Sequence, residues 1–425
     1  MRDILLLVIL IGLVPMILRR PFVGVLAWCW LSYMVPHRLA FGFMASFPSA
    51  QVIAIACLLT FFFSKEPKSI PKPSPIIWLF VLYLWMILTY LTHDQTEFVN
   101  YLAGKVFKIQ LFTLIILAML TTRKRIEGAL WVVALSIGFY GFKGGIYTLL
   151  TGGGGRVLGP PGGFFEGNNE LGLALVIIVP ILLYLVTTLD KKWQKIIVWS
   201  VIGFSAISVL GTQSRGALVA IIACGAFLWL KSDKKLMITG LLIVAIPSGI
   251  AFMPQSWHER MDTIVESNED AYDSSVKGRF NAWRMSINIA SDQIFGGGFN
   301  AATRANFLVY APDPLDFHDF HSIYFQMLGK HGWGGLLIFL MMYYFTWRLA
   351  GKTAKLVEGD EELEWAGRLC RMLQVSLIAY AAGGAFLGLA YFDLPFHILI
   401  TIVAISTVIN KKLKVRETQI SVIEG

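Results

Sequence analysis

The stretch from residue 193 to residue 230, WQKIIVWSVIGFSAISVLGTQSRGALVAIIACGAFLWL, decides the fold class. Two apolar runs, at about 193–211 and 215–231, are interrupted only by the six residues from Gly211 to Gly216. A helix needs about 20 mostly apolar residues to cross the hydrocarbon core of a bilayer. Each run therefore predicts a membrane-spanning helix, and we expect Arg215 at the membrane surface between them.

The composition of the whole chain agrees with this interpretation. Of the 425 residues, 56% are apolar and 15% are charged, whereas an ordinary soluble domain is about 25% charged. Comparable apolar runs lie at roughly 3–18, 21–36, 49–64, 75–92, 107–121, 126–149, 169–188, 235–252, 321–349, 366–390 and 393–410. The sequence excludes a soluble enzyme and predicts an all-α polytopic integral membrane protein with about 12 transmembrane helices. Whether the short first run crosses the membrane stays open.

Basic residues cluster in the loops that follow every second apolar run. Examples of these clusters are Arg19–Arg20, Arg123–Arg125, Lys191–Lys192 and Lys411–Lys412. The positive-inside rule places such loops in the cytoplasm, so the intervening loops face the other side of the membrane. The net charge of +9 therefore reflects membrane orientation and gives no reason to expect a nucleic-acid partner.

One long polar segment, 253–320, interrupts the apolar pattern on the non-cytoplasmic side. It contains ten acidic and five basic residues and carries a net charge of −5, which leaves +14 on the rest of the chain. Its apolar residues recur at helical spacing and predict the buried face of an amphipathic helix: Phe280, Trp283, Ile287, Ala290 and Ile294. The predicted organisation is a transmembrane bundle over 1–252, this helical loop, further transmembrane helices over 321–410, and a cytoplasmic tail over 411–425.

The polar residues between the spanning runs are candidates for function, because ionisable groups at membrane depth are costly. Arg215 has Gln213 and Ser214 beside it, where a plain turn needs no hydrogen-bonding side chains. The alternative is a structural arginine whose charged end reaches the membrane surface.

A glycine-rich loop, TGGGGRVLGPPGGFFEGNNE at 151–170, contains Arg156. Glycines allow backbone amides to approach an anion closely, so we expect Arg156, Asn169 and Glu170 to bind substrate. The alternative is that Asn168 or Asn169 caps the next helix and Glu170 stabilises its first turn.

Two further candidates lie in and after the polar segment. Arg279 and Trp283 are four residues apart and share a helical face, although a solvated amphipathic helix explains them equally. His321 opens the next apolar run, where it can accept a proton near neutral pH and act as a general base. Asp313, Asp316, His318 and Asp319 precede it, but their spacing matches no specific metal pattern, so no metal site is predicted.

Arginines bind phosphates through two parallel hydrogen bonds, and a histidine activates a hydroxyl. The set therefore suits the displacement of a lipid-linked diphosphate by a sugar hydroxyl, with arginines neutralising the leaving group.

In these motifs the chain resembles the O-antigen ligase and O-antigen polymerase superfamily, most closely the branch of exosortase-associated O-glycosylation ligases. The resemblance rests on SIGFYGFKGGIYTLLTGG, GPPGGFFEGNNELGLAL, LGTQSRGALVA, KGRFNAWRMSINIA and FHDFHSIYFQMLGKHGW. It implies a C-type (GT-C) membrane glycosyltransferase of the bacterial inner membrane, without metal, nucleotide or other cofactor. The implied donor is a glycan on undecaprenyl diphosphate in the periplasmic leaflet, and the implied acceptor is lipid A–core oligosaccharide, with inversion at the anomeric carbon.

The resemblance also implies roles for three residues. Arg215 falls on the arginine of SRGA and Arg279 on that of the GR pair, and both would hold the diphosphate. His321 falls on the family's histidine and would be the general base. Ser322 and Lys330-His331-Gly332 depart from the family pattern, which often has Asn and an acidic residue there.

Three alternatives stay open. A protein O-glycosylation ligase and an O-antigen polymerase would use the same donor. A transporter would need internal repeats and cations at the membrane midplane, and the polar groups of this sequence cluster instead toward one face.

Overall fold

A computed structural model describes residues 1–231, 239–240, 243, 247, 251–255, 257–258 and 274–424. The regular structure of these residues is entirely helical, which confirms the all-α prediction. The α-helices are α1 (Arg2–Arg19), α2 (Pro21–Met34), α3 (Ser49–Phe63), α4 (Ser74–Leu91), α5 (Glu97–Met119), α6 (Arg123–Leu150), α7 (Asn168–Leu185), α8 (Lys192–Gly211), α9 (Arg215–Lys231), α12 (Ser274–Asp292), α13 (Arg304–Tyr310), α14 (Ile323–Leu356), α15 (Glu364–Gly384) and α16 (Asp393–Glu424). Three 3-10 helices are Pro36–Leu39, Phe43–Ala45 and Val186–Thr188.

Six described helices are long and apolar enough to cross a membrane. They are α4, α5, α6, α7 with its 3-10 extension, α8 and the first part of α16. The shorter apolar helices are α2, α3 and Arg215–Leu230. The apolar run at 235–252 lies largely outside the described residues, and about 12 transmembrane helices stays a prediction.

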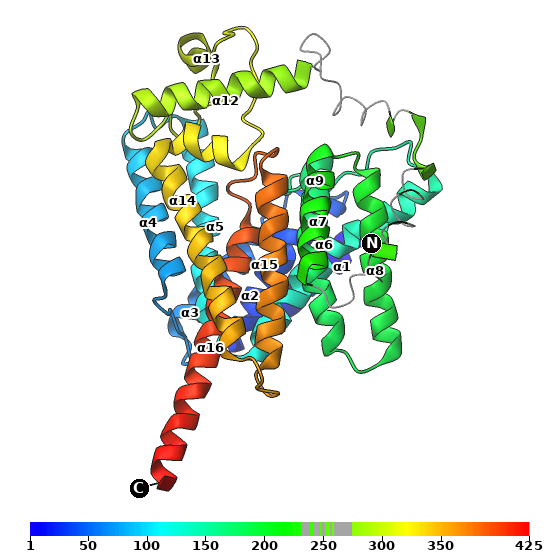
Figure 1. Cartoon of the computed structure of the whole chain (residues 1–425), viewed down its shortest axis with the longest axis vertical. Coiled ribbons are helices and arrows are strands. Elements are labelled where there is room, and N and C mark those ends of the chain that lie inside the picture. Colours follow the sequence, from blue (N-terminus) through cyan, green and yellow to red (C-terminus); the bar gives the residue numbers. More distant parts are fainter. Residues whose placement is uncertain are drawn as a thin grey trace.

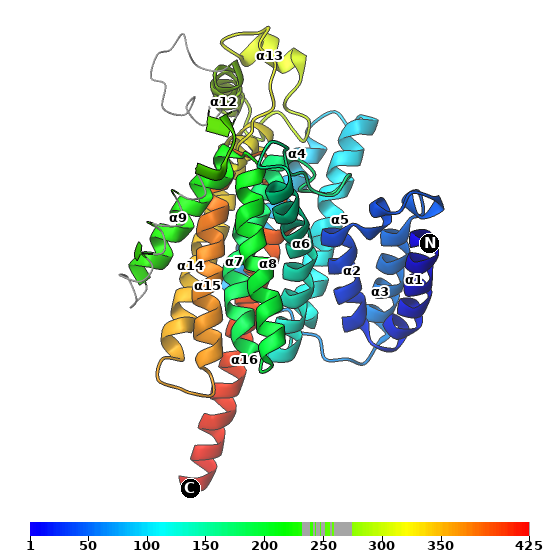
Figure 2. The ribbon, with the colours of Figure 1, turned by 90° about the vertical axis from the view of Figure 1, so that its right-hand side faces the viewer.

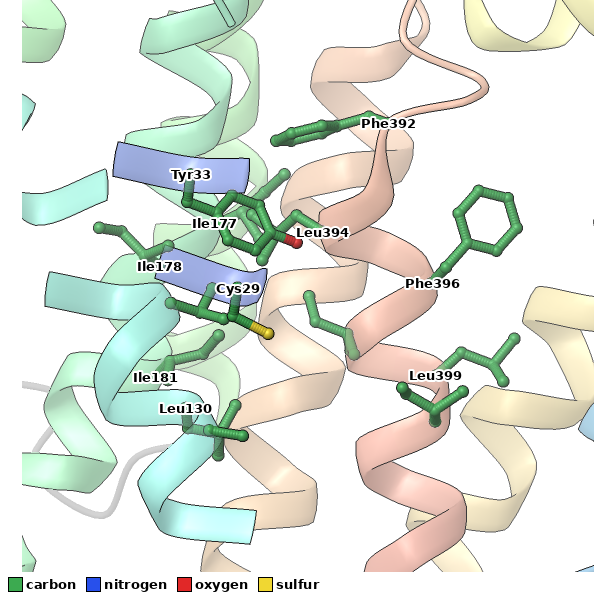
Figure 3. Packing of buried hydrophobic residues seen from close by; sticks show 14 of the residues in the cluster. Cys29, Tyr33, Leu130, Ile177, Ile178, Ile181, Phe392, Leu394, Phe396 and Leu399 are labelled. Atoms are coloured by element: carbon green, nitrogen blue, oxygen red, sulfur yellow. The ribbon is translucent and has the colours of Figure 1, made fainter. Parts of the chain in front are cut away.

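The helices form one bundle whose core runs through α7 and α16. All residues of α7 from Leu171 to Ile178 are buried, as expected for a helix that is apolar on every side. Figure 3 shows Ile177, Ile178 and Ile181 in the same buried cluster as Leu130 of α6 and Leu394 of α16. Beside this core, α1, α2 and α3 form a group next to α5 and α6 (Figure 2).

Small residues bring α6 and α8 into close contact. A Cβ atom on Gly145 would lie 2.2 Å from the carbonyl oxygen of Phe204. Only glycine allows the two backbones to approach so closely, which is a common way to pack helices in membranes.

Helices α12 and α13 lie over one end of the bundle, opposite the end from which α16 projects (Figure 1). The amphipathic helix is confirmed as α12, but the predicted apolar face is partly wrong. Phe280 and Ile294 are 52% and 76% exposed, whereas Ala282, Met285 and Ile289 are fully buried. The face turned inward is rotated by about one residue, because α12 packs against Phe307 and Phe320 on one side only.

Helix α14 kinks where it passes beneath α12. Gly332 has φ +69° inside the helix, and a Cβ atom there would lie 2.2 Å from the carbonyl oxygen of Ile294. The kink frees three carbonyl groups, and the surroundings satisfy each of them. The amides of Gly297 and Gly298 donate to the carbonyls of residues 329 and 330, and Trp85 Nε1 donates to that of residue 331.

Candidate functional site

His321 lies at the junction between the loop after α13 and the start of α14. It is half-buried and has φ +44°, a backbone conformation that is uncommon outside glycine and often found at functional sites. Neighbouring contacts hold this conformation. Trp283 Nε1 donates a 2.7 Å hydrogen bond to the carbonyl of Phe320, and its ring stacks on Phe325 with centroids 4.6 Å apart.

The charges around His321 come from three separate parts of the chain. Burial lowers the pKa of the imidazole below its ordinary value, and the charges of Arg279 and His318 lower it further. Asp319 and Glu170 act in the opposite direction. The imidazole is therefore neutral at pH 7, which is the form that accepts a proton.

Arg279 reaches this site because α12 packs closely on the loop before His321. A Cβ atom on Gly278 would lie 2.3 Å from Nδ1 of His318, so the helix backbone lies directly against that ring. His318 is in turn 2.9 Å from the carboxylate of Asp316. Asn281 Nδ2 donates to the carbonyls of Asp313 and Asp316, 2.7 Å and 2.9 Å away.

The glycine-rich loop is attached to the turn that carries Arg215. Arg156 Nε donates to Gln213 Oε1 at 3.4 Å, and Gln213 Nε2 donates to the carbonyl of Gly153 at 3.3 Å. Gln213 has φ +54°, so this turn, like His321, holds a side-chain-bearing residue in a left-handed conformation. The glycine-rich loop and the Arg215 turn, which lie far apart in sequence, are therefore joined by hydrogen bonds into one region of the structure.

The start of α7 closes the same region. Its N-cap is Gly167, with no side-chain cap, so the capping alternative for Asn168 and Asn169 is wrong. Asn168 Nδ2 instead donates to the carbonyl of Thr212 at 2.7 Å. Glu170 lies in the first turn as predicted, and Asn169 is half-buried beside it.

A short segment between α15 and α16 connects the Arg215 turn to His321. A Cβ atom on Gly216 would lie within 3.7 Å of Gly383, Phe386 and Leu387. A Cβ atom on Gly388 would lie 3.2 Å from Asp319 Oδ2 and 4.0 Å from Cα of His321. We call Arg156, Glu170, Arg215, Arg279 and His321 the arginine–histidine site.

No group of three histidine, cysteine or carboxylate side chains in the described part of the chain could hold a metal ion. The predicted substrate residue Trp283 has its indole N–H engaged by the backbone, and its ring remains half-buried beside the site.

Three lysines within the bundle were not predicted as candidates from the sequence. The fifth apolar run is predicted at 107–121, whereas α5 begins at Glu97, so Lys105 lies inside the helix with Lys108 and not in the loop before it. Lys330 lies inside α14. The signal was present, because a lysine within an apolar helix is costly and is a functional candidate by default.

Comparison with protein families gives two matches. Residues 200–340 match the family described as O-antigen ligase, and this range contains Arg215, Arg279 and His321. Residues 1–189 match a family of unknown function (DUF5935). A comparison with curated proteins finds no match. The first match confirms the resemblance to the O-antigen ligase superfamily that the motifs indicated.

Proposed function

We propose that this chain, whose residues 200–340 carry an O-antigen ligase domain, transfers a glycan from undecaprenyl diphosphate to a hydroxyl group of lipid A–core oligosaccharide. The observation that carries the proposal is the position of His321, a half-buried histidine whose preceding loop packs against Gly278, the neighbour of Arg279. Burial lowers the pKa of His321, and Arg279 and Glu170 are close enough for their charges to act on it. A neutral base beside a cation is what the displacement of a diphosphate by a hydroxyl requires.

In the proposed reaction, His321 accepts the proton of the acceptor hydroxyl. The hydroxyl oxygen then forms a bond to the anomeric carbon of the donor glycan, while the bond from that carbon to the diphosphate oxygen breaks. Attack from the side opposite the leaving group inverts the anomeric carbon. Undecaprenyl diphosphate leaves with the bonding electron pair, and the proton passes from His321 to water.

Arg215 and Arg279 neutralise the charge that develops on the leaving diphosphate. Charged hydrogen bonds are strongest where water is largely excluded, and both arginines are half-buried. Neutralisation by arginines requires no metal or cofactor, in line with what the family resemblance implies.

The remaining residues shape the donor site. Arg156 and the glycine-rich loop hold the phosphates from one side, because that loop is hydrogen-bonded to the Arg215 turn. Asn169 and Glu170 hydrogen-bond the sugar next to the diphosphate. Trp283 offers a flat apolar face for a sugar ring while it holds the backbone before His321.

The proposed setting is the bacterial inner membrane, with about 12 transmembrane helices of a GT-C-type transferase and the site facing the periplasm. Residues 253–320 would form the periplasmic loop between the bundles at 1–252 and 321–410. Basic residues at the opposite ends of the helices support this orientation.

Reconstitution tests the function. The full chain in lipid vesicles is supplied with undecaprenyl-diphosphate glycan and purified lipid A–core, and we expect a ligated glycolipid. Transfer only to a protein hydroxyl or to a second lipid-linked glycan would show that the proposed acceptor is wrong and that the proposed donor is right.

Movement of the donor across the membrane without transfer would show that the chain is a transporter and not a transferase. His258→Ala is the matched control for histidine variants, because His258 is not among the five residues of the arginine–histidine site and is only partly buried.

A further inference from the structure

Two adjoining cavities lie beside the arginine–histidine site. Their volumes are about 180 Å³ and 380 Å³, and Lys105 and Phe164 line both. Walls come from α2, α5, the glycine-rich loop and the segment between α15 and α16. We call them together the lysine cavity, defined by His37, Lys105, Lys108, Phe164, Lys330 and Tyr391.

The lining of this cavity is positive. Three lysines and one histidine face it, and no acidic side chain lines it among the described residues. Within the described part of the chain, none of the three lysines forms an ion pair. Instead, the Nζ of Lys105 lies 4.1 Å from the ring centroid of Phe164, and that of Lys330 lies 5.4 Å from Tyr391.

Two carboxylates, Asp393 and Asp319, lie nearby, but neither lines the cavity. Asp393 Oδ2 accepts a 2.7 Å hydrogen bond from Ser32, whereas its Oδ1 has no hydrogen-bond partner among the described residues. Asp319 lies beside Gly388, where a Cβ atom would be 3.2 Å from its Oδ2, and its charge raises the pKa of His321. The aromatic rings hold the ammonium groups in place by cation–π contact, so the lysines can meet an anion within the cavity.

Two further features of the rim indicate a ligand. Nδ1 of His37 is buried and has no hydrogen-bond partner among the described residues, which is costly unless a ligand or water satisfies it. Val35, also in the lining, has φ +46°. A β-branched residue rarely adopts this conformation, and such strain is concentrated at functional sites.

The depth of the lysines needs an explanation. Lys105 is eight residues from the first residue of α5, which places it about 12 Å along the helix axis. A lysine at that depth in a membrane-spanning helix loses much of the solvation of its charge, which is energetically costly. An anionic group that binds beside the lysine would offset this cost.

The cavity begins next to His321. Gly388 lines it and also lies against Asp319 and His321. Along the same segment, Ala390 donates its amide hydrogen to Gln326 Oε1 at 2.9 Å, and Gln326 lines the cavity too. The segment therefore has the Arg215 turn at its start, His321 at its middle and the lysine cavity at its end.

We propose that the lysine cavity binds a phosphate group of a lipid substrate, at a place distinct from the diphosphate held by Arg215 and Arg279. This inference rests on the proposed function, because that reaction brings a phosphorylated acceptor to His321 and releases a polyprenyl diphosphate beside it. The phosphate has two sources of the same chemistry: a phosphorylated glycolipid acceptor, or the polyprenyl diphosphate that leaves after transfer.

A binding experiment with the full chain in nanodiscs separates these sources. The probes are lipid A–core, the same glycolipid after enzymatic removal of its phosphates, and undecaprenyl diphosphate without sugar. The test variant is Lys105→Gln with Lys330→Gln, and the matched control is Lys192→Gln with Lys195→Gln on α8. Thermal melting checks folding, and Lys105→Arg with Lys330→Arg tests whether positive charge alone restores binding.

We expect the test variant to bind one or both phosphorylated probes at least tenfold more weakly, with the control and the arginine variant near wild type. A loss confined to lipid A–core assigns the cavity to the acceptor, and a loss confined to undecaprenyl diphosphate assigns it to the leaving group. If the test variant binds both phosphorylated probes with unchanged affinity, the proposed phosphate site is wrong. It is also wrong if the variant binds the dephosphorylated glycolipid as much more weakly as it binds the phosphorylated one.

The two proposals fail in different ways. If the wild type binds phosphorylated lipid through these lysines but transfers no glycan, the proposed function is wrong and the phosphate site in the lysine cavity is right. If the test variant binds lipid and transfers glycan as the wild type does, only the phosphate site is wrong.

Discussion

The indole Nε1 of Trp283 donates a 2.7 Å hydrogen bond to the carbonyl oxygen of Phe320, the residue before His321. This bond connects α12 to the backbone that carries the proposed base. Because His321 has φ +44°, its backbone needs such support from its neighbours.

Trp283→Phe removes this hydrogen bond and keeps an aromatic ring to stack on Phe325. We expect a stability loss of about 1–3 kcal/mol, because a buried carbonyl loses its donor, and a clear fall in kcat. Thermal melting and transfer kinetics measure both effects. Unchanged kcat would show that the bond does not position His321.

His321→Ala should lower the transfer rate by about 10²–10⁴-fold, the usual contribution of a general base. Donor binding should stay near wild type, because the arginines remain. Activity within twofold of the wild type, with His258→Ala as the reference, would contradict the assignment.

Asp319→Asn tests the electrostatics of the base. The Asp319 charge raises the pKa of His321, so its removal should lower that pKa further. Because the neutral imidazole is the active form, the acid limb of the rate profile should move to lower pH. Arg279→Gln removes a charge that lowers the same pKa and should move the limb to higher pH. Profiles of kcat/KM against pH measure both shifts, and two shifts in the same direction would contradict this arrangement.

Arg215→Ala and Arg279→Ala should each cost about 2–4 kcal/mol of transition-state stabilisation if they meet the leaving diphosphate. The loss should appear in kcat/KM for transfer, and lysine at either position should restore it only in part, because lysine lacks the paired geometry. Exposed Arg348 on α14 provides the control, and its replacement by alanine should leave the rate unchanged. A full rate in either test variant would remove that arginine from the mechanism.

Gly332→Ala tests the kink in α14. The new Cβ atom would meet the carbonyl of Ile294 at 2.2 Å, in a backbone region that alanine adopts only with strain. We expect the protein to melt well below the wild type. Gly203→Ala on α8 meets no atom within 4 Å and should match or slightly exceed wild-type stability. Equal melting temperatures for both variants would contradict the packing of the kink.

The sequence predicted the helical class and the membrane setting because apolar runs of that length have few other uses. The SRGA arginine and the histidine at the head of a spanning run were also visible as exceptions to that pattern. Their relation to one another was not, because it depends on how α12 folds back over the bundle.

The lysine cavity was missed for a different reason. Lys105 and Lys108 interrupt the apolar pattern, and the predicted run begins at residue 107, after Lys105, whereas the helix begins at Glu97. The buried face of α12 was also misplaced, since apolar spacing identifies a helical period but not the partner that covers it. Phe280 and Ile294 fit the period and remain exposed.

The kink in α14 has a consequence for folding. Its freed carbonyls receive amide donors from Gly297 and Gly298, which lie in the loop that follows α12. Lipid cannot supply those donors, so the kinked shape of α14 depends on the loop that follows α12. Neither element reaches its final structure without the other, and the backbone before His321 is held between them.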